Sequence, residues 1–442
     1  SLLLAWRHLL EDGSLESLYD FLDPLWALHD AKGWYAGVID LARDLLGLLG
    51  TLPETPELVR EKVALQTSVA RALMTISGYG AEVEAAFKEA LSLSDETGQV
   101  PERFPVLRSL TSLYTLSGDM RNAAHTSREM LKLALAHDDP AMEMEASMVV
   151  GVHEANSGAP EQGLARLERA VELYDPTERR HERFRLGPNP GIQSLTSSAL
   201  VLAMLGHNDR ALLRARRAEE ESAALNHPAT RAYALHHVAF VYSGLGRFDL
   251  IGDLGNELLT VAIDHDYPIW RAVAMVWQGL AALAAGDAGG LSRLEEGMTL
   301  YQGESAPPVF WPMMLILLAA GNAMAGRLDV ALARVDDSLE LTAGTPNATE
   351  ALVMRGDLLL GIHGVEAADE ALEGWETALA IAQEAGFRPA ALKAATRIAR
   401  MAMGTDRETV ALQRLSFIHD GFTEGFDAPD LVAAREVLGR PT

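Results

Sequence analysis

Apolar runs of about helix length recur along this chain, and most are opened by a proline and closed by a glycine. Residues 228–267 show the pattern: the stretch ATRAYALHHVAFVYSGL ends at Gly246, and a second stretch, FDLIGDLGNELLTVAI, follows before Pro268. Proline fits the first turn of a helix, where its missing N–H removes no hydrogen bond. Glycine ends a helix because positive φ costs it little. The pattern therefore predicts pairs of antiparallel helices, a helix A and a helix B, joined by a glycine turn.

The closing glycines recur at a nearly fixed interval. They are Gly78, Gly118, Gly158, Gly206, Gly246, Gly286, Gly326, Gly364 and Gly404. Successive members are 40, 40, 48, 40, 40, 40, 38 and 40 residues apart, and Gly33 lies 45 residues before the first. One unit repeated over nearly the whole chain is typical of a helical solenoid, in which each unit buries its apolar face against its neighbours.

Small residues occupy two fixed places relative to the turn glycine. Gly151 and Gly279 lie seven residues before it, and Gly163 lies five residues after it. Small side chains let two helix axes approach closely, and Tyr114 and Tyr242, four residues before the glycine, fill the remaining gap. This order resembles the tetratricopeptide repeat (TPR), lengthened to about 40 residues. We therefore expect an all-α, right-handed superhelical solenoid of nine or ten TPR-like hairpins. Repeat regularity favours an open array, because similar neighbour contacts do not close into a ring.

The regularity of the repeats divides the chain into three parts. We expect atypical N-terminal helical repeats over residues 1–55 and a TPR-like solenoid over residues 56–404, with an inserted loop over residues 175–190. Capping helices are expected over residues 405–442. The chain begins with Ser1 inside a helical pattern, so we expect it to be a piece of a longer protein.

Composition limits the function classes. The chain has 442 residues, of which 48% are hydrophobic, a net charge of −25 and no cysteine. Absence of cysteine excludes disulfides and thiol chemistry and suits a cytoplasmic location. We expect no membrane contact, no cofactor and no metal site. The negative charge argues against direct nucleic-acid binding. In one interpretation, the negative charge keeps a long solenoid soluble. In the other, it forms an acidic groove for a basic partner.

The inserted loop holds the densest basic cluster of the chain, within LYDPTERRHERFRLGPNPG. Its basic residues are Arg179, Arg180, His181, Arg183 and Arg185. Guanidinium groups recognise carboxylates and phosphates, so Arg179, Arg183 and Arg185 are candidate ligand-binding residues. The alternative is structural: the arginines pair with acidic side chains of neighbouring repeats and fix the loop.

A second candidate group lies on two successive predicted A helices. Trp270 and Trp277 are seven residues apart on one helix face, with Arg271 and Gln278 beside them, and His236 lies on the preceding helix A. Core packing explains the tryptophans in one interpretation. In the other they form an aromatic ledge in the concave groove, where A helices meet a peptide or protein partner.

From about Leu58 to its C-terminus the chain resembles a known family region. The likeness lies in residues 64–90 (ALQTSVARALMTISGYGAEVEAAFKEA), residues 173–192, residues 267–286 (YPIWRAVAMVWQGLAALAAG) and the tail FTEGFDAPDL, residues 422–431. The family is the TPR region of bacterial multidomain signalling proteins, in which a class III nucleotidyl cyclase or winged-helix domain precedes a STAND-type ATPase. The resemblance implies a sensor of a signalling or transcriptional regulator, bound to a partner or to an upstream domain of its own polypeptide. No phosphate-binding GxxxxGK[ST] motif occurs, so neither ATPase nor cyclase activity is assigned to this chain.

Two function classes remain. One is a non-catalytic binding array that takes a peptide, protein or small ligand in its concave groove. The other is an enzyme of the α/α-toroid type, with a carboxylate pair at the centre of a helical ring. Regular 40-residue units favour the binding array.

The acidic run at Asp336 and Asp337 tests the enzyme alternative, because it mimics a metal-binding box. We expect it to be the solvated face of a helix B. Asp336→Ala with Asp337→Ala should then leave both ligand affinity and the circular dichroism spectrum unchanged. Loss of function in a folded double variant would return the carboxylates to candidate catalytic status.

Overall fold

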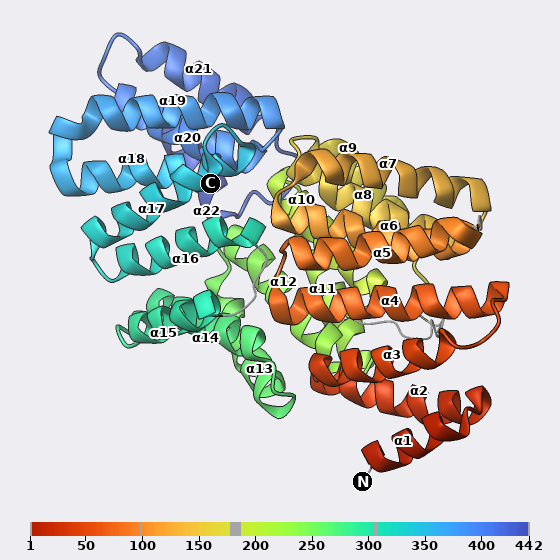
Figure 1. The fold of residues 1–442 in the computed structure, drawn as a ribbon. Coiled ribbons are helices and arrows are strands. Elements are labelled where there is room, and N and C mark those ends of the chain that lie inside the picture. Colours follow the sequence, from red (N-terminus) through yellow and green to blue (C-terminus); the bar gives the residue numbers. More distant parts are fainter. Residues whose placement is uncertain (1, 98–99, 177–186, 304–307, 441–442) are drawn as a thin grey trace.

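The computed structural model describes residues 2–97, 100–176, 187–303 and 308–440 (Figure 1). Within these ranges every regular element is helical. The A helices are α2 (Leu15–Lys32), α4 (Pro56–Ser77), α6 (Val100–Ser117), α8 (Pro140–Asn156), α10 (Pro190–Met204), α12 (Pro228–Gly244), α14 (Pro268–Ala284), α16 (Trp311–Met324), α18 (Thr349–His363) and α20 (Arg388–Ala402). The B helices are α3 (Tyr35–Leu49), α5 (Ala81–Thr97), α7 (Met120–His137), α9 (Pro160–Leu173), α11 (Asn208–Ala224), α13 (Ile251–Asp264), α15 (Gly290–Gly303), α17 (Leu328–Thr342), α19 (Ala368–Ala385) and α21 (Glu408–His419).

Shorter and terminal elements complete the chain. Helix α1 (Leu2–Asp12) precedes the first hairpin, and α22 (Pro429–Val437) follows the last. The 3₁₀ turns of the described ranges are η1 (Phe248–Leu250), η2 (Pro308–Phe310), η3 (Pro346–Ala348) and η4 (Gly364–Ala367). The described part of the chain thus forms ten helical hairpins, and the prediction of an all-α repeat solenoid is confirmed. No described helix has the length and apolarity to cross a membrane.

The glycine turns follow from backbone geometry. Gly206 and Gly246 adopt φ of +83° and +71°, which side chains other than glycine rarely tolerate. The next residue then donates its N–H back into the preceding helix, His207 to the Leu202 carbonyl at 2.9 Å and Arg247 to the Tyr242 carbonyl at 2.8 Å. These bonds satisfy carbonyls that a helix end leaves unpaired. Each A helix therefore ends at its predicted glycine.

The small residues lie where the two helices of a hairpin cross. A Cβ added at Gly163 would lie 2.6 Å from the carbonyl oxygen of Gly151, and one at Gly279 would lie 2.7 Å from that of Gly290. Such distances leave no room for any side chain. The predicted close approach of helices A and B is confirmed at these crossings.

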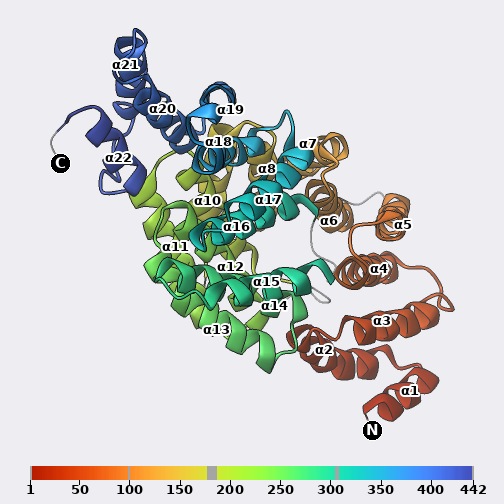
Figure 2. The ribbon, with the colours of Figure 1, turned by 90° about the vertical axis from the view of Figure 1, so that its left-hand side faces the viewer.

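The A helices line the inside of the superhelix. From α4 to α20 each A helix contacts the A helix of the next hairpin. Among the described helices, no two B helices pack closely against each other. Some A helices are buried on nearly all sides, as in α12, where residues from Ala229 to Tyr242 are almost continuously buried. The B helices form the outer layer, and the chain winds about a common axis (Figure 2).

Successive turns of this superhelix touch, which the expected open array did not include. On one side of the contact are the glycine loops that link helix A to helix B within a hairpin. On the other side, one superhelical turn further on, are the loops that link helix B to helix A of the following hairpin. A Cβ atom added at Gly33 would lie 3.0 Å from the ring of Tyr267. A Cβ atom added at Gly158 would lie 3.6 Å from the ring of Pro346. We call this contact the seam. It arises because the small rotation from one repeat to the next accumulates until about five repeats complete a turn.

Polar contacts reinforce the seam at both of its ends. Toward the N-terminus the Asp30 carboxylate lies 3.5 Å from the imidazole of His227. Toward the C-terminus the backbone N–H of Gly425 donates to the Asp209 carboxylate at 3.1 Å, and that of Arg210 donates to Glu424 at 3.2 Å. These two pairs are 216 and 214 residues apart in sequence.

The tail motif of residues 422–431 is therefore a seam element. The Phe422 ring, 5% exposed, packs beneath Gly206, and Pro429 packs against Gly246. Tyr267, from another of the family-like stretches, packs against Gly33 at the opposite end of the same contact. Phe422, Pro429 and Tyr267 therefore hold successive turns together.

Replacing Gly206 should weaken the seam. Gly206→Ala imposes left-handed strain of roughly 1–2 kcal/mol and also drives a methyl group into the Phe422 ring, which lies 2.6 Å from the position of a Cβ. Urea unfolding should show a larger loss of stability than Gly118→Ala, and hydrogen exchange should accelerate in residues 422–431.

Gly118→Ala is the matched control, because Gly118 has φ of +85° but no atom within 4 Å of an added Cβ. Equal losses of stability in the two variants, with unchanged exchange in the tail, would contradict the seam.

Candidate functional site on the inner face

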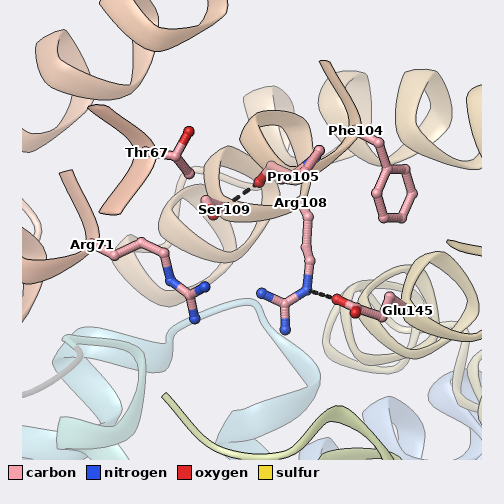
Figure 3. Close-up of a pocket in the computed structure, with 7 residues that line it drawn as sticks. All are labelled: Thr67, Arg71, Phe104, Pro105, Arg108, Ser109 and Glu145. Atoms are coloured by element: carbon pink, nitrogen blue, oxygen red, sulfur yellow. Dashed lines mark hydrogen bonds and ion pairs between the residues drawn. The ribbon is translucent and has the colours of Figure 1, made fainter. Parts of the chain in front are cut away.

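A small hollow lies on the inner face between α4, α6 and α8 (Figure 3). Its lining residues are Thr67 and Arg71 from α4, Phe104, Pro105, Arg108 and Ser109 from α6, and Glu145 from α8. All three helices are A helices, so the hollow opens toward the interior of the superhelix. The guanidinium groups of Arg71 and Arg108 point into the same space.

Arg108 and Glu145 form a buried ion pair. Their side chains are 10% and 8% exposed, and Nε of Arg108 meets the Glu145 carboxylate. Removing two charges from water is costly, and the pair persists because the opposite charges are in direct contact. Glu145 engages the Nε edge of the guanidinium, so a terminal nitrogen of Arg108 remains directed toward Arg71 (Figure 3).

The hydroxyl groups of the hollow are already used as donors. Thr67 donates to the Val63 carbonyl at 2.7 Å, and Ser109 donates to the Pro105 carbonyl at 3.0 Å. Each bond runs four residues back along the same helix, a common arrangement for a hydroxyl inside a helix. The N–H donors that converge on the hollow are therefore those of the two arginines.

An aromatic and histidine cluster lies further along the inner helices, on α12 and α14. Nε1–H of Trp277 donates to Nδ1 of His236 at 3.0 Å, and the Trp277 side chain is 1% exposed. The His236 ring lies 4.6 Å from Phe240 and 5.5 Å from Trp270, measured between ring centres. Because His236 accepts this hydrogen bond through Nδ1, its ring is neutral with the proton on Nε2. Burial lowers the pKa of His236 well below its usual range, and adjacent His237 lowers it further.

His237 has a separate environment. Its Nδ1 lies 2.8 Å from the Tyr233 carbonyl, to which it donates, and its ring stacks on that of Tyr233 at 3.8 Å. Phe310 of η2 also approaches the ring, edge-on, with 6.4 Å between ring centres. Burial lowers the pKa of His237 to about 4, although the backbone hydrogen bond opposes the shift.

The residues proposed from sequence have different positions. Trp277 is a core residue, Trp270 is partly buried, and Arg271 is exposed. Gln278 binds Asn256 at 2.8 Å and accepts from Arg293 at 2.9 Å, so it joins α13, α14 and α15. Arg179, Arg183 and Arg185 lie outside the described residues. The structure therefore brings His236, Trp270 and Trp277 together and directs Gln278 toward the outer helices.

Arg71, Arg108 and Glu145 were not recognised from the sequence. They are spaced 37 residues apart, and each is a charged residue within an A helix. Their spacing, close to the repeat period, could have revealed them. A charged residue inside a buried helix needs a partner, because an unpaired buried charge is costly.

The fold defines a class: this is a TPR-like helical-repeat protein. No family model matches the chain, and no curated protein matches its sequence. Among solved structures, a Rap protein complexed with competence and sporulation factor aligns with a TM-score of 0.56 at 12% identity, covering 87% of this chain and 97% of its own. At this identity the Rap alignment shows a shared fold.

Two structures of the quorum sensor NprR also align, both with a TM-score of 0.48. The apo form from B. thuringiensis is 12% identical, with 82% of this chain and 99% of that chain covered. The complex of NprR with its cognate peptide NprX is 13% identical, with 72% and 90% covered.

The buried histidines should make stability depend on pH. Because folding lowers their pKa values, the unfolded chain binds protons first as the pH falls. Stability from His237 is complete above its unfolded pKa of about 6.5 and is lost as the pH falls toward about 4.

His237→Gln removes one titrating group, so urea unfolding between about pH 4.5 and 7.5 should show a shallower decline, by up to ~1.4 kcal/mol per pH unit. His125→Gln, on an exposed face of α7, is the control. An unchanged slope in His237→Gln would contradict the buried, neutral state.

Proposed function

We propose that this chain is a non-catalytic, TPR-type sensor that binds a peptide or a protein segment on its inner face. The convergence of Arg71 and Arg108 on one hollow of that face is the observation that carries the proposal. A Rap protein with the same fold is complexed with competence and sporulation factor, and this supports a bound partner for the present chain. A peptide suits the interior because an extended chain exposes charged and apolar groups in regular succession.

The inner face offers two chemically different regions for such a ligand. The arginine hollow lies on α4, α6 and α8, and the aromatic cluster with Trp270 lies on α12 and α14. Phe310 lies beside His237, and η2, which contains it, also contacts α6. Element η2 therefore connects the two regions across the interior. A ligand that touches either region would also alter the packing of η2.

The seam supplies a route for relay. Asp30 and Gly33 of the first hairpin contact His227 and Tyr267 at the starts of α12 and α14. A ligand that favours one spacing of successive turns would shift this contact, since a ligand changes an equilibrium only through different affinities for its two states. In our proposal the first hairpin passes this change to an upstream module.

We further propose the cellular context that the family-like stretches imply. The chain would be the sensor region of a bacterial signalling or transcriptional regulator, preceded in the same polypeptide by a STAND-type ATPase with a cyclase or winged-helix domain. In this proposal the N-terminal repeats adjoin that module, and the repeat region itself performs no catalysis.

Selection from a random peptide library tests the function. The full 442-residue chain would be immobilised, and enriched peptides would be resynthesised and titrated by isothermal calorimetry. We expect Kd values in the micromolar range or tighter, about −8 kcal/mol. The bound peptide should protect the A helices α4, α6 and α8 from hydrogen exchange.

Two results would contradict the proposal. One is the absence of any enriched peptide that binds in solution. The other is protection confined to the outer B helices, which would move the binding surface to the convex face.

A further inference from the structure

We infer that the two edges of the seam are docking surfaces for a second copy of this chain, which binds head to tail and continues the superhelix. The inference goes beyond the proposed function and needs no ligand on the inner face. It rests on the seam itself, because both of its edges extend past the residues that cover them.

The edge of glycine turns is uncovered at the end of the array. In stacked antiparallel hairpins every A-to-B turn lies on one edge, and every B-to-A connection lies on the other. Gly158 and Gly246 are covered, since an added Cβ would lie within 4 Å of a proline of the next superhelical turn. Among the described residues, no atom lies that close to the turn glycines of the last four hairpins, Gly286, Gly326, Gly364 and Gly404.

Apolar side chains are exposed on this open edge. Met403, one residue before its turn glycine, is 52% exposed, and Val365, one residue after its turn glycine, is 85% exposed. Leu205 has the place of Met403 in the fifth hairpin, and it is 1% exposed. A Cβ added at Gly386, on the next superhelical turn, would lie 3.9 Å from Leu205. The open edge thus presents apolar groups where the seam buries them, which is typical of an interaction surface.

The opposite edge is open over the first hairpins, and it carries prolines in the places that the seam uses. Pro346, three residues before α18, and Pro429, the first residue of α22, each lie against a turn glycine in the seam. Pro53 lies three residues before α4, as Pro346 does before α18, and Pro140 is the first residue of α8. Both Pro53 and Pro140 are exposed. This edge therefore offers the same contact to another molecule.

One register pairs the two open edges. Gly326 follows α16 and Gly404 follows α20, so these turns lie two hairpins apart. Pro53 precedes α4 and Pro140 begins α8, so these prolines also lie two hairpins apart. A second copy placed along the superhelical axis sets Pro53 against Gly326 and Pro140 against Gly404. The two surfaces differ, so the contact repeats into chains of molecules and does not close into a pair.

The same register matches opposite charges. In the seam Glu161, three residues after its turn glycine, lies 3.6 Å from Arg388 at the start of α20. Arg407 is likewise three residues after its turn glycine, and it is exposed. Asp138 and Asp139 directly precede α8. Docking brings Arg407 toward these two carboxylates, so the ion pair of the seam recurs with its signs exchanged.

Sedimentation velocity of the full 442-residue chain tests the association. We expect the sedimentation coefficient to rise with protein concentration at physiological ionic strength. Salt is needed because each copy carries a net charge of −25, and screening over about 8 Å weakens the repulsion between copies. A chain that stays monomeric at every concentration would overturn the inference.

Charged variants test the turn edge. Met403→Glu, Val365→Glu and Arg407→Glu should each weaken the association at least about 10-fold, because an unpaired or like charge is costly within an interface. Leu213→Glu is the matched control: it adds the same carboxylate at a leucine that is 66% exposed on α11, outside both edges. Urea unfolding verifies that each variant is folded. Equal association of all four variants would contradict the docking edge.

Cross-linking of single-cysteine variants tests the head-to-tail arrangement. Met403→Cys marks the turn edge, and His137→Cys marks the connection edge at the exposed end of α7. A mixture of the two should give a linked dimer with a short bismaleimide, whereas each variant alone should remain largely unlinked. If Met403→Cys alone links as efficiently as the mixture, the copies meet about a two-fold axis and the inference is wrong.

Discussion

The contact between successive superhelical turns is the constraint on which the interior of this protein depends. A TPR-like array needs only neighbour contacts to be stable, and without further contacts its pitch remains adjustable. Here the glycine turns of one turn meet the B-to-A connections of the next, from Gly33 with Tyr267 to Gly246 with Pro429. This seam fixes the pitch, and the pitch fixes the distance across the inner face. It also brings together residues more than two hundred positions apart, as with Asp209 and Gly425.

An enclosed interior changes the chemistry of its side chains. Arg108 and Glu145 remain charged because they pair, whereas His236 and His237 respond to burial through lowered pKa values. The inner face therefore has a charged region on α4, α6 and α8 and a neutral aromatic region on α12 and α14. Hydroxyl groups of the inner face donate to their own helices, as Thr67 does within the charged region. In the proposed function, specificity depends on a few charged and aromatic groups, and the repeat scaffold determines where they meet.

Local patterns in the sequence predicted the repeat, because the helix ends and the helix crossings depend on residues that are close in sequence. Positive φ requires glycine at positions such as Gly206, and close helix crossings require glycine at Gly151 and Gly163. The seam was not predictable in this way, because it depends on small rotations added over about five repeats. Phe422 contacts Gly206 because of this accumulated rotation, and the residues next to Phe422 in sequence do not reveal the contact.

The candidate site was predicted only in part, for a similar reason. Trp270, Trp277 and His236 were recognised by their type and spacing, and they do lie together. Their burial was left open, because core and groove residues share the same helical period. Arg71 and Arg108 were missed, since a single charge on an apolar helix has no meaning until the opposite side chains are known. The arginine-rich insertion attracted more attention by composition, and its central residues lie outside the described ranges.

Cross-linking across the seam tests the account most directly, because the chain has no cysteine of its own. Glu161 and Arg388 lie 3.6 Å apart in an ion pair between consecutive superhelical turns. Glu161→Cys with Arg388→Cys should react with a short bismaleimide to give an internally linked monomer of altered mobility. Glu161→Cys with Val365→Cys, whose second site is exposed at the far end of α18, should not. Efficient linkage of the first pair alone is the predicted result. Equal linkage of both pairs, or linkage of neither, would contradict a superhelix whose successive turns are in contact.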